Sequence, residues 1–236
     1  GLFVADYGNT RDGWAAERIS APATSLSKIP PHLNWEEAAT LASAGVTAWN
    51  TLNGLGRMKA GDTVLVLGTG GVSIWGLQLA KAGGAKVIVT SSSNEKLAKA
   101  KALGADVLIN YKTTPEWDKE VLAATNGYGA DIILETVGTG SLTKSLQAAA
   151  YCARIGLIGG LDASQPPQIF PLVAKNAILG GITVGSRKML DDMLAAVDVK
   201  KIKPVVDKVF AFDELPKAYD YLAGASHFGK VVIKHG

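Results

Sequence analysis

Residues 64–97 constrain the fold more than any other part of the sequence. An apolar run, "VLVLG", leads into a glycine-rich turn, an amphipathic stretch follows, and a second apolar run ends at Thr90. A buried strand, a glycine turn, a helix and another buried strand together make the repeating unit of a parallel sheet that is covered by helices. We therefore expect an α/β fold built around this unit.

Short β-branched runs continue to alternate with helical patterns along the chain. The strand-like runs cover 63–67, 86–90, 107–110, 131–136, 154–159 and 182–186, and the helical patterns cover 72–82, 94–103, 116–125 and 142–150. Strands that are apolar throughout and are separated by helix-length connections predict a doubly wound parallel sheet of the Rossmann type.

The two ends of the chain depart from this alternation. Residues 15–26 are typical of strand and loop, and Asn34 is placed to cap a helix that has Glu36 and Glu37 in its first turn. Near the C-terminus, the runs 205–212, 215–223 and 230–234 predict strand, helix and strand. We expect both ends to form a second, smaller unit, which divides the chain into 1–34, 35–203 and 204–236.

Charge and composition argue against several classes of partner. The net charge of +3 comes from 24 basic and 21 acidic residues without long runs of one sign, and no apolar run approaches the length of a membrane span. Nucleic acid and membrane are therefore not expected as partners, whereas a small anionic molecule is. Cys152 is the single cysteine, which suits a reducing compartment such as the cytoplasm, and we interpret it as buried packing rather than as a nucleophile.

The glycine-rich turn is placed to bind phosphate groups. Gly68 permits a tight turn, Gly70 lets the backbone approach a pyrophosphate, and the small Ser73 lets the helix pack against the strand. Free N–H groups and the helix dipole favour anions at such a turn. A glycine turn without a ligand is the alternative, and the strand before it and the helix after it argue against that interpretation.

The serines at 91–93 follow the second strand, where an acidic residue would bind the ribose hydroxyls of NAD. A carboxylate there would repel a 2′-phosphate, and serines remove that repulsion. Lys96 lies one helical turn further on, and Tyr111 follows the third strand. This arrangement predicts a preference for NADP(H). The alternative is that residues 92–95 form only a capping box, with Glu95 as its acidic member, and both interpretations can hold together.

Several motifs together resemble one known superfamily. In order, they are "EEAATLASAGVTAWNTL", "GDTVLVLGTGGVS", "LGADVLINY", "GLIGGL", "VGSRK" and "HFGKVVI". They resemble the medium-chain dehydrogenase/reductase superfamily, most closely its quinone-oxidoreductase-like and zinc-type alcohol-dehydrogenase-like branch. The resemblance covers nearly all of the chain from Gly13 onward. It implies a Rossmann cofactor domain with remnants of a GroES-like catalytic β domain from both chain ends, most of the GroES-like portion being absent.

The resemblance also implies a set of NADP(H)-binding residues at the carboxyl ends of the strands. They are Thr47, Gly68, Gly70, Gly71, Val72, Ser91, Ser92, Lys96, Tyr111, Val137, Ile158, Gly159, Gly160, Gly185, Ser186, Phe228 and Lys230. Each has a plainer alternative: turn geometry for the glycines, packing at strand ends for Val137 and Ile158, and a solvated edge charge for Lys230. As a set, they favour the cofactor interpretation.

The chain departs from its zinc-dependent relatives at a metal ligand. Those relatives place a cysteine in the motif that reads "LASAGVTAW" here, and this chain has Ser43. One cysteine elsewhere and the histidines His32, His227 and His235 do not make a Cys/His zinc site, so no metal is expected. In "AAAYCARIGLIGG", Cys152 also stands where relatives usually carry a Gly-Gly turn, which predicts an altered turn.

The function expected from the resemblance is that of a zinc-independent, NADPH-dependent reductase acting on a carbonyl, enone or quinone. Tyr7 and Tyr151 bear hydroxyls but lack positional support as proton donors, so the catalytic residues stay unassigned. The alternative is a truncated, non-catalytic NADP(H)-binding paralogue that acts as a sensor or assembly subunit. We also expect a homodimer formed through the last parallel strand, "GGITVGS", because pairing would hide an exposed edge.

Overall fold

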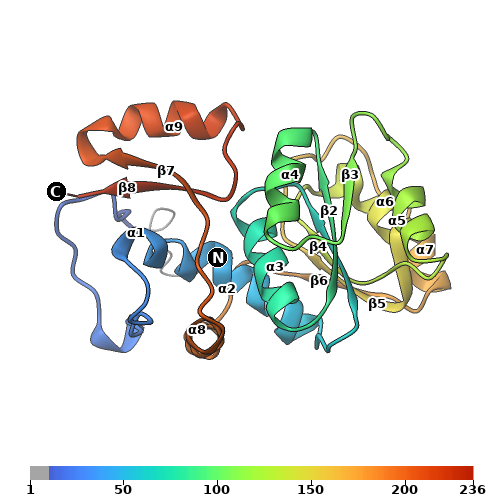
Figure 1. Cartoon of the computed structure of the whole chain (residues 1–236), viewed down its shortest axis with the longest axis horizontal. Helices are drawn as coiled ribbons and strands as arrows, with labels where there is room; N and C mark the ends of the chain where they lie inside the picture. The colour runs from blue at the N-terminus through green and yellow to red at the C-terminus, as the bar shows by residue number, and fades with distance from the viewer. Residues whose placement is uncertain (1–10, 236) are drawn as a thin grey trace.

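The computed structural model describes residues 11–235 and, within them, has a six-stranded parallel sheet with helices on both faces (Figure 1). The strand order is β3-β2-β1-β4-β5-β6, so the order reverses between β1 and β4. The strands are β1 (Thr63–Leu67), β2 (Lys86–Ser91), β3 (Val107–Asn110), β4 (Ala130–Glu135), β5 (Ala149–Leu157) and β6 (Ile178–Gly181). The predicted doubly wound Rossmann fold is therefore confirmed.

Two hydrophobic layers, one on each face of the sheet, form the core. Val64 and Val66 of β1 belong to one layer, whereas Leu65 and Leu67 belong to the other, as the alternation of side chains along a strand requires. Helices α3 (Gly71–Ala82), α4 (Asn94–Ala102) and α8 (Arg187–Lys200) contribute to the first layer, and α5 (Trp117–Ala124) and α6 (Thr139–Ala148) contribute to the second. Burial on both faces explains why the strand sequences are apolar throughout.

The edge strand β6 lies earlier in the sequence than predicted. The strand expected at 182–186 is wrong, because β6 pairs with β5 from Ile178 to Gly181 and ends there. Its partner β5 itself ends at Leu157, which pairs with Gly181, so the ladder cannot continue. The sequence pattern favoured the β-branched residues of 182–186, although the length of the partner strand sets the register.

The expected burial of Cys152 is also wrong. Its side chain is exposed, and its backbone adopts φ +59°, the left-handed region that favours glycine. The Cys152 N–H donates to the Lys175 carbonyl at 2.7 Å, beside an irregularity in the pairing of β4 with β5. The altered turn predicted at this position is therefore a residue within β5 that adopts the left-handed conformation although it is not glycine.

The entry into the sheet is helical, as expected. Asn34 caps α1 (Trp35–Ala38): its Oδ1 accepts from the Glu37 N–H at 2.8 Å, and the Glu37 carboxylate accepts from the Asn34 N–H at 2.9 Å. Further helical turns at 41–45 and 50–55 flank α2 (Val46–Trp49). The strand expected within residues 15–26 is absent; this fully described segment contains only the 3₁₀ turn Ala23–Ser25.

The C-terminal segment forms the predicted strand, helix and strand. β7 (Val206–Ala211) and β8 (Lys230–Lys234) pair in parallel, α9 (Leu215–Ala223) connects them, and this sheet is separate from the larger one. Figure 1 shows β7, β8 and α9 at the opposite end of the molecule from α5, α6 and α7 (Phe170–Ala174). The division into 1–34, 35–203 and 204–236 stays a prediction, and residues 1–10 lie outside the described part of the chain.

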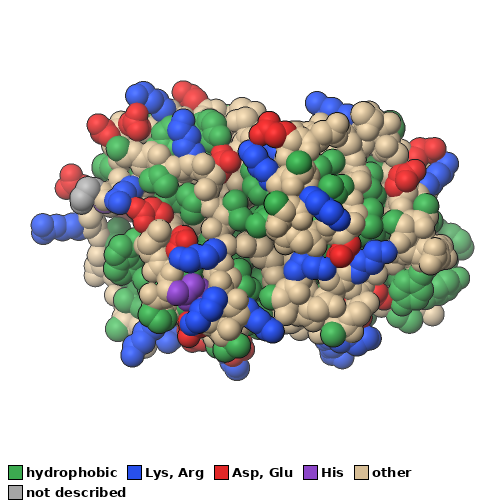
Figure 2. Space-filling view, in the orientation of Figure 1, with side chains coloured by type: hydrophobic (Ala, Val, Ile, Leu, Met, Phe, Trp, Pro, Cys, Tyr) green, Lys and Arg blue, Asp and Glu red, His purple; other side chains and the backbone are tan. Residues whose placement is uncertain are grey.

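The surface drawn in Figure 2 carries basic and acidic side chains interspersed with apolar ones. Within the described residues, no helix combines the length and the apolar character that crossing a membrane requires.

Candidate cofactor site

The carboxyl ends of β1, β2, β4 and β5 open into a cavity of about 420 Å³. Ligands of doubly wound sheets bind at this position, where the strand order reverses. The predicted cofactor residues that line the cavity are Gly68, Gly70, Gly71, Val72, Ser91, Ser92, Lys96, Tyr111, Val137 and Ile158. The structure therefore brings the glycine turn, the end of β2 and the ends of β4 and β5 to one place.

The glycine turn leaves its backbone open to the cavity. Gly68 has φ +74°, and a Cβ built on Gly68 or Gly70 would meet no atom within 4 Å. Within the part of the chain that the structure describes, no side chain caps the N-terminus of α3, so its first N–H groups lie at the cavity without a side-chain acceptor. Ser73, the third small residue, donates its hydroxyl to the Leu67 carbonyl at 2.6 Å and ties α3 to β1. A phosphate group fits this cradle.

Polar side chains surround the end of β2. Ser91 is buried, and its hydroxyl accepts from the Ser93 N–H at 3.3 Å. Ser93 is the N-cap of α4, accepting from the Lys96 N–H at 3.3 Å. Ser92 and Tyr111 line the cavity without taking part in this cap. The capping role and the open polar wall therefore belong to different serines.

Glu95, the acidic residue that follows these serines, forms an ion pair on its own helix. The Glu95 carboxylate pairs with Lys99 at 2.9 Å, one turn along α4, and Glu95 is not among the residues that line the cavity. The wall next to Ser92 therefore carries the cationic Lys96 without a neighbouring carboxylate.

The loop after β4 is fixed by a buried carboxylate. Glu135 is 0% exposed, and its Oε1 accepts from the N–H groups of Val137 at 3.0 Å and Gly138 at 3.2 Å. Hydroxyls donate as well, from Ser141 at 2.7 Å and from Ser145 at 2.5 Å. Four donors on one enclosed carboxylate hold the loop that places Val137 in the cavity.

The ends of β4 and β5 approach each other closely at Gly159. A Cβ built on Gly159 would lie 1.9 Å from the Thr136 carbonyl oxygen, so only glycine fits there. Gly160 has open space around it. Thr136 donates its hydroxyl to the Leu67 carbonyl at 2.7 Å, which joins β4 to β1 at the floor of the cavity.

A segment far along the sequence forms the remaining wall. We call residues 225–230 the C-terminal strap; it joins α9 to β8 and runs beside α3 and α4 (Figure 1). At one end, the Ala225 carbonyl accepts from the Lys96 ammonium at 2.6 Å. At the other end, the Gly229 N–H donates to the Thr69 carbonyl at 3.0 Å. Ala225 and His227 line the cavity.

Lys230 covers the glycine turn from the strap. A Cβ built on Gly71 would lie 2.4 Å from Lys230 Cδ, so the lysine stem lies directly over this glycine. Burial lowers the pKa of the Lys230 ammonium below its ordinary value, because enclosure disfavours the charged form. Phe228, beside it, is 4% exposed and packs into the first hydrophobic layer.

Three of the predicted cofactor residues make their contacts with other parts of the protein and not at the cavity. Thr47 is buried in α2 and donates its hydroxyl to the Ser43 carbonyl at 2.7 Å. Gly185 packs against Val46, and the Ser186 hydroxyl caps α8. These three do not line the cavity, and neither do Gly159, Gly160, Phe228 and Lys230.

Sequence reasoning missed other lining residues, namely Leu67, Thr69, Thr136, Leu161, Ala225 and His227. Thr69 and Thr136 adjoin predicted residues, so their position next to the strand ends was the available signal. His227 belongs to the "HFGKVVI" motif, from which only Phe228 and Lys230 were selected.

The described residues do not fit a zinc site. Ser43, which stands in the place of a cysteine ligand, is exposed. No group of three or more histidine, cysteine, aspartate or glutamate side chains within the described part of the chain is arranged to hold a metal ion. We therefore derive no step through a metal.

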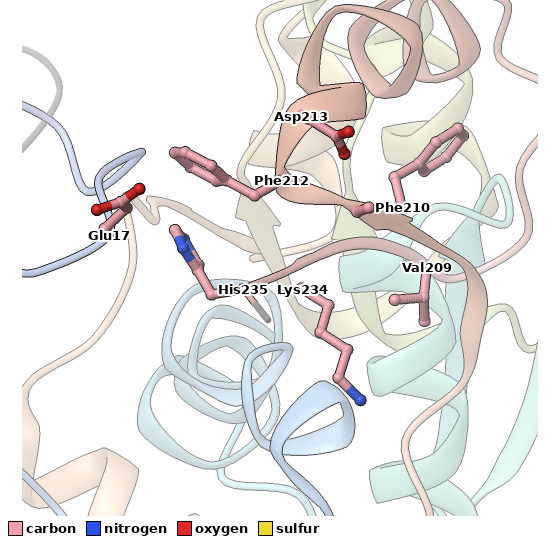
Figure 3. A pocket seen from close by; sticks show the side chains of 8 residues that line it. Glu17, Val209, Phe210, Phe212, Asp213, Lys234 and His235 are labelled. Atoms are coloured by element: carbon pink, nitrogen blue, oxygen red, sulfur yellow. The ribbon is translucent and has the colours of Figure 1, made fainter.

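A second cavity, of about 730 Å³, lies on the small C-terminal sheet (Figure 3). Phe212 and His235 form its aromatic side, with ring centroids 4.1 Å apart, and Glu17 faces them from the N-terminal segment. Although this cavity is larger, it lies away from the glycine turn and the carboxyl ends of the main sheet.

Comparison with known proteins identifies the family. The family described as "Zinc-binding dehydrogenase" matches residues 71–198. A zinc-type alcohol dehydrogenase-like protein of Schizosaccharomyces pombe is 47% identical over 234 residues, which are 96% of this chain and 68% of the relative. The chain spans about two thirds of the length of the alcohol dehydrogenase-like relatives it matches.

Two solved structures resemble the fold closely. One is an NAD-dependent alcohol dehydrogenase, with a TM-score of 0.88 and 35% identity over 97% of this chain and 67% of that one. The other is the quinone oxidoreductase of Thermus thermophilus, solved also as its NADPH complex, with a TM-score of 0.81 and 30% identity over 95% of this chain and 74% of that one.

Proposed function

The chain belongs to the medium-chain dehydrogenase/reductase superfamily, and we propose that it is an NADP(H)-dependent oxidoreductase that transfers hydride to a carbonyl, enone or quinone substrate. The observation that carries the proposal is the single cavity shared by the glycine turn and by Ser92, Lys96 and Tyr111. One similar structure is named for NAD and another for its NADPH complex, so the choice between the two cofactors depends on this chain's own residues.

Each wall of the cavity has a distinct task in this proposal. The open backbone at Gly70 and the uncapped start of α3 hold the pyrophosphate. Ser92, Lys96 and Tyr111 supply hydroxyl and ammonium donors to the 2′-phosphate. Val137, together with the other apolar residues at the ends of β4 and β5, packs on the nicotinamide and excludes water.

The bound cofactor supplies the hydride, and the protein binds and orients it. We propose that the reaction is zinc-independent, because the described residues do not fit a metal site. The proton donor stays unassigned. Tyr151 is 72% exposed near the start of β5, at the amino ends of the strands and therefore on the side of the sheet away from the cavity. Tyr7 lies outside the described residues.

The cofactor preference is tested by a charge placed at the end of β2. Ser92→Asp puts a carboxylate beside the 2′-phosphate position, so we expect NADPH affinity to fall at least tenfold while NADH affinity is kept or improved. Ser92→Ala is the matched control without charge and should keep the preference for NADPH. Equal loss of both cofactors in Ser92→Asp, or wild-type protein that prefers NADH, would contradict the proposal.

The proposed assembly is an isologous homodimer through the edge strand β6. Ile178 is 48% exposed on this edge, and Phe170 and Val173 of the neighbouring α7 are 75% and 68% exposed. Pairing of two β6 strands would cover this apolar surface and satisfy the open edge. Light scattering should give a dimer mass for the wild type and a monomer mass for Ile178→Lys. A monomer mass for the wild type at micromolar concentration would contradict the proposed dimer.

A second candidate function is a non-catalytic NADP(H)-binding subunit or sensor. The observation that favours it is the open aromatic cavity at Phe212 and His235, which offers a surface for a partner (Figure 3). This candidate would be favoured over the reductase if the protein binds NADPH but does not oxidise it in the presence of any carbonyl, enone or quinone from a broad panel. We also propose a cytoplasmic location, since a reducing compartment suits a sequence whose one cysteine, Cys152, is exposed.

A further inference from the structure

His227 is the titratable residue of the cavity to which the function above gives no task. It lies in the middle of the C-terminal strap, between the hydrogen bond from Lys96 to the Ala225 carbonyl and the hydrogen bond from the Gly229 N–H to the Thr69 carbonyl. These two hydrogen bonds fix the strap backbone on both sides of His227, between the predicted 2′-phosphate wall and the glycine turn.

The two ring nitrogens of His227 have different surroundings. Nδ1 is enclosed and has no hydrogen-bond partner among residues 11–235. A buried N–H without an acceptor is costly, so the tautomer that leaves Nδ1 without hydrogen and carries it on Nε2 is the favoured one. Nε2 is not enclosed in this way, and the cavity is the open space that the residue lines. A donor that lines this cavity and has no partner among the described residues is available to an acceptor on the ligand.

The charges around the ring favour its neutral form. Burial lowers the pKa of His227, and the ammonium groups of Lys96 on α4 and Lys230 on β8 lower it further. Asp207 on β7 acts in the opposite direction, but its carboxylate already accepts from the Tyr221 hydroxyl of α9 at 2.7 Å. Besides His227 and Lys96, the titratable side chain that lines the cavity is Tyr111.

We propose that His227 is a cofactor-recognising residue whose neutral imidazole donates a hydrogen bond from Nε2 to a phosphate oxygen of the bound dinucleotide. The inference rests on the proposed function, since it takes the ligand to be a nicotinamide dinucleotide. The pyrophosphate and the 2′-phosphate both offer phosphate oxygens that can accept this hydrogen bond. The strap thus adds a neutral donor to the cationic groups of Lys96 and Lys230.

Two variants separate hydrogen bonding from packing. His227→Gln keeps an N–H donor, whereas His227→Phe keeps the ring volume without a donor. We expect the Phe variant to bind NADPH about tenfold to a hundredfold more weakly, and the Gln variant to stay within a few-fold of wild type. His235→Phe, at the other cavity, is the matched control and should bind like wild type. Thermal unfolding of each variant checks that it is folded.

Parallel titration with NADH locates the phosphate. Equal losses for both cofactors in His227→Phe assign the bond to the pyrophosphate, and a loss with NADPH alone assigns it to the 2′-phosphate. If His227→Phe binds like wild type, or if His227→Gln binds as weakly as His227→Phe, the inference is overturned while the proposed function stands. If the wild type binds neither cofactor, both fall.

The protonation state has its own measurement, which needs no activity and no variant. The ¹⁵N resonances of the imidazole in the NADPH complex at pH 7.5 should show one protonated nitrogen, Nε2, and one unprotonated nitrogen, Nδ1. A doubly protonated ring, or a ring protonated on Nδ1 alone, would overturn the neutral Nε2 donor.

Discussion

Glu135 links the stability of the fold to the shape of the cavity, and replacing it gives a prediction whose size follows from the structure. Glu135→Leu removes the acceptor of two backbone N–H groups, those of Val137 and Gly138. The hydroxyls of Ser141 and Ser145 can rotate to other acceptors, but the backbone donors cannot. Each unsatisfied buried donor costs roughly 1–3 kcal/mol, so we expect a loss of about 4 kcal/mol in the free energy of unfolding.

Glu135→Gln provides the matched comparison. Its carbonyl oxygen can replace Oε1 as the acceptor, and its amide nitrogen can donate to the Ser145 hydroxyl, so a loss of only about 1 kcal/mol is expected. For a chain of this size, 1 kcal/mol corresponds to roughly 2–4 °C in Tm. Urea titration and thermal unfolding followed by circular dichroism measure both variants.

The same pair of variants tests the connection to the cavity. Glu135→Leu should also weaken NADPH binding, because the loop that carries Val137 into the cavity loses its anchor. Glu135→Gln should keep most of the affinity. The reasoning is refuted if the Leu variant is less than 1 kcal/mol below the Gln variant, or if it binds NADPH as the wild type does.

Further predictions concern the backbone and the acid stability. Cys152→Gly should raise the free energy of unfolding by about 0.5–1 kcal/mol, since glycine adopts φ +59° without strain, and Cys152→Val should lower it; equal urea midpoints would count against this. Gly159→Ala should lower both Tm and NADPH affinity because its Cβ would meet a carbonyl oxygen at 1.9 Å, while Gly160→Ala should change neither; similar behaviour of the two would contradict the close approach. Burial raises the pKa of Asp106, but the hydrogen bonds from the Lys81 ammonium and a backbone N–H outweigh it and lower the pKa overall, so its contribution to stability is present above pH ~4 and is lost as the pH falls through the lowered value. Asp106→Asn should therefore flatten the acid limb of a stability–pH curve, and an unchanged limb would refute this.

The parts of the fold that were predicted correctly depend on neighbours in sequence. β1, the glycine turn and α3 follow one another directly, so apolar pattern and turn chemistry were enough to place them. The position of β6 depends on where β5 ends, and the conformation of Cys152 depends on an irregular pairing between β4 and β5. Such pairings join distant segments, and local patterns carry little information about them.

The same distinction holds for the cavity. Local chemistry was enough to single out the turn at Gly70 and the polar residues after β2, which line the cavity. Ala225 and His227 were missed because the strap reaches the cavity through the contact of Lys96 with the Ala225 carbonyl, which nothing in the local sequence indicates. Ser186 was predicted from its motif alone; its hydroxyl caps α8, and it does not line the cavity.

The most direct test of the central claim is a parallel titration of the wild-type chain with NADPH and NADH, followed by thermal stability. At a hundred times its dissociation constant, a ligand adds roughly 2.7 kcal/mol, or about 5–11 °C in Tm for a chain of this size. The account predicts this shift with NADPH and a much smaller one with NADH at the same concentration, because the proposal assigns the 2′-phosphate to the cavity wall formed by Ser92, Lys96 and Tyr111. An equal or larger shift with NADH, or no shift with either, would contradict it.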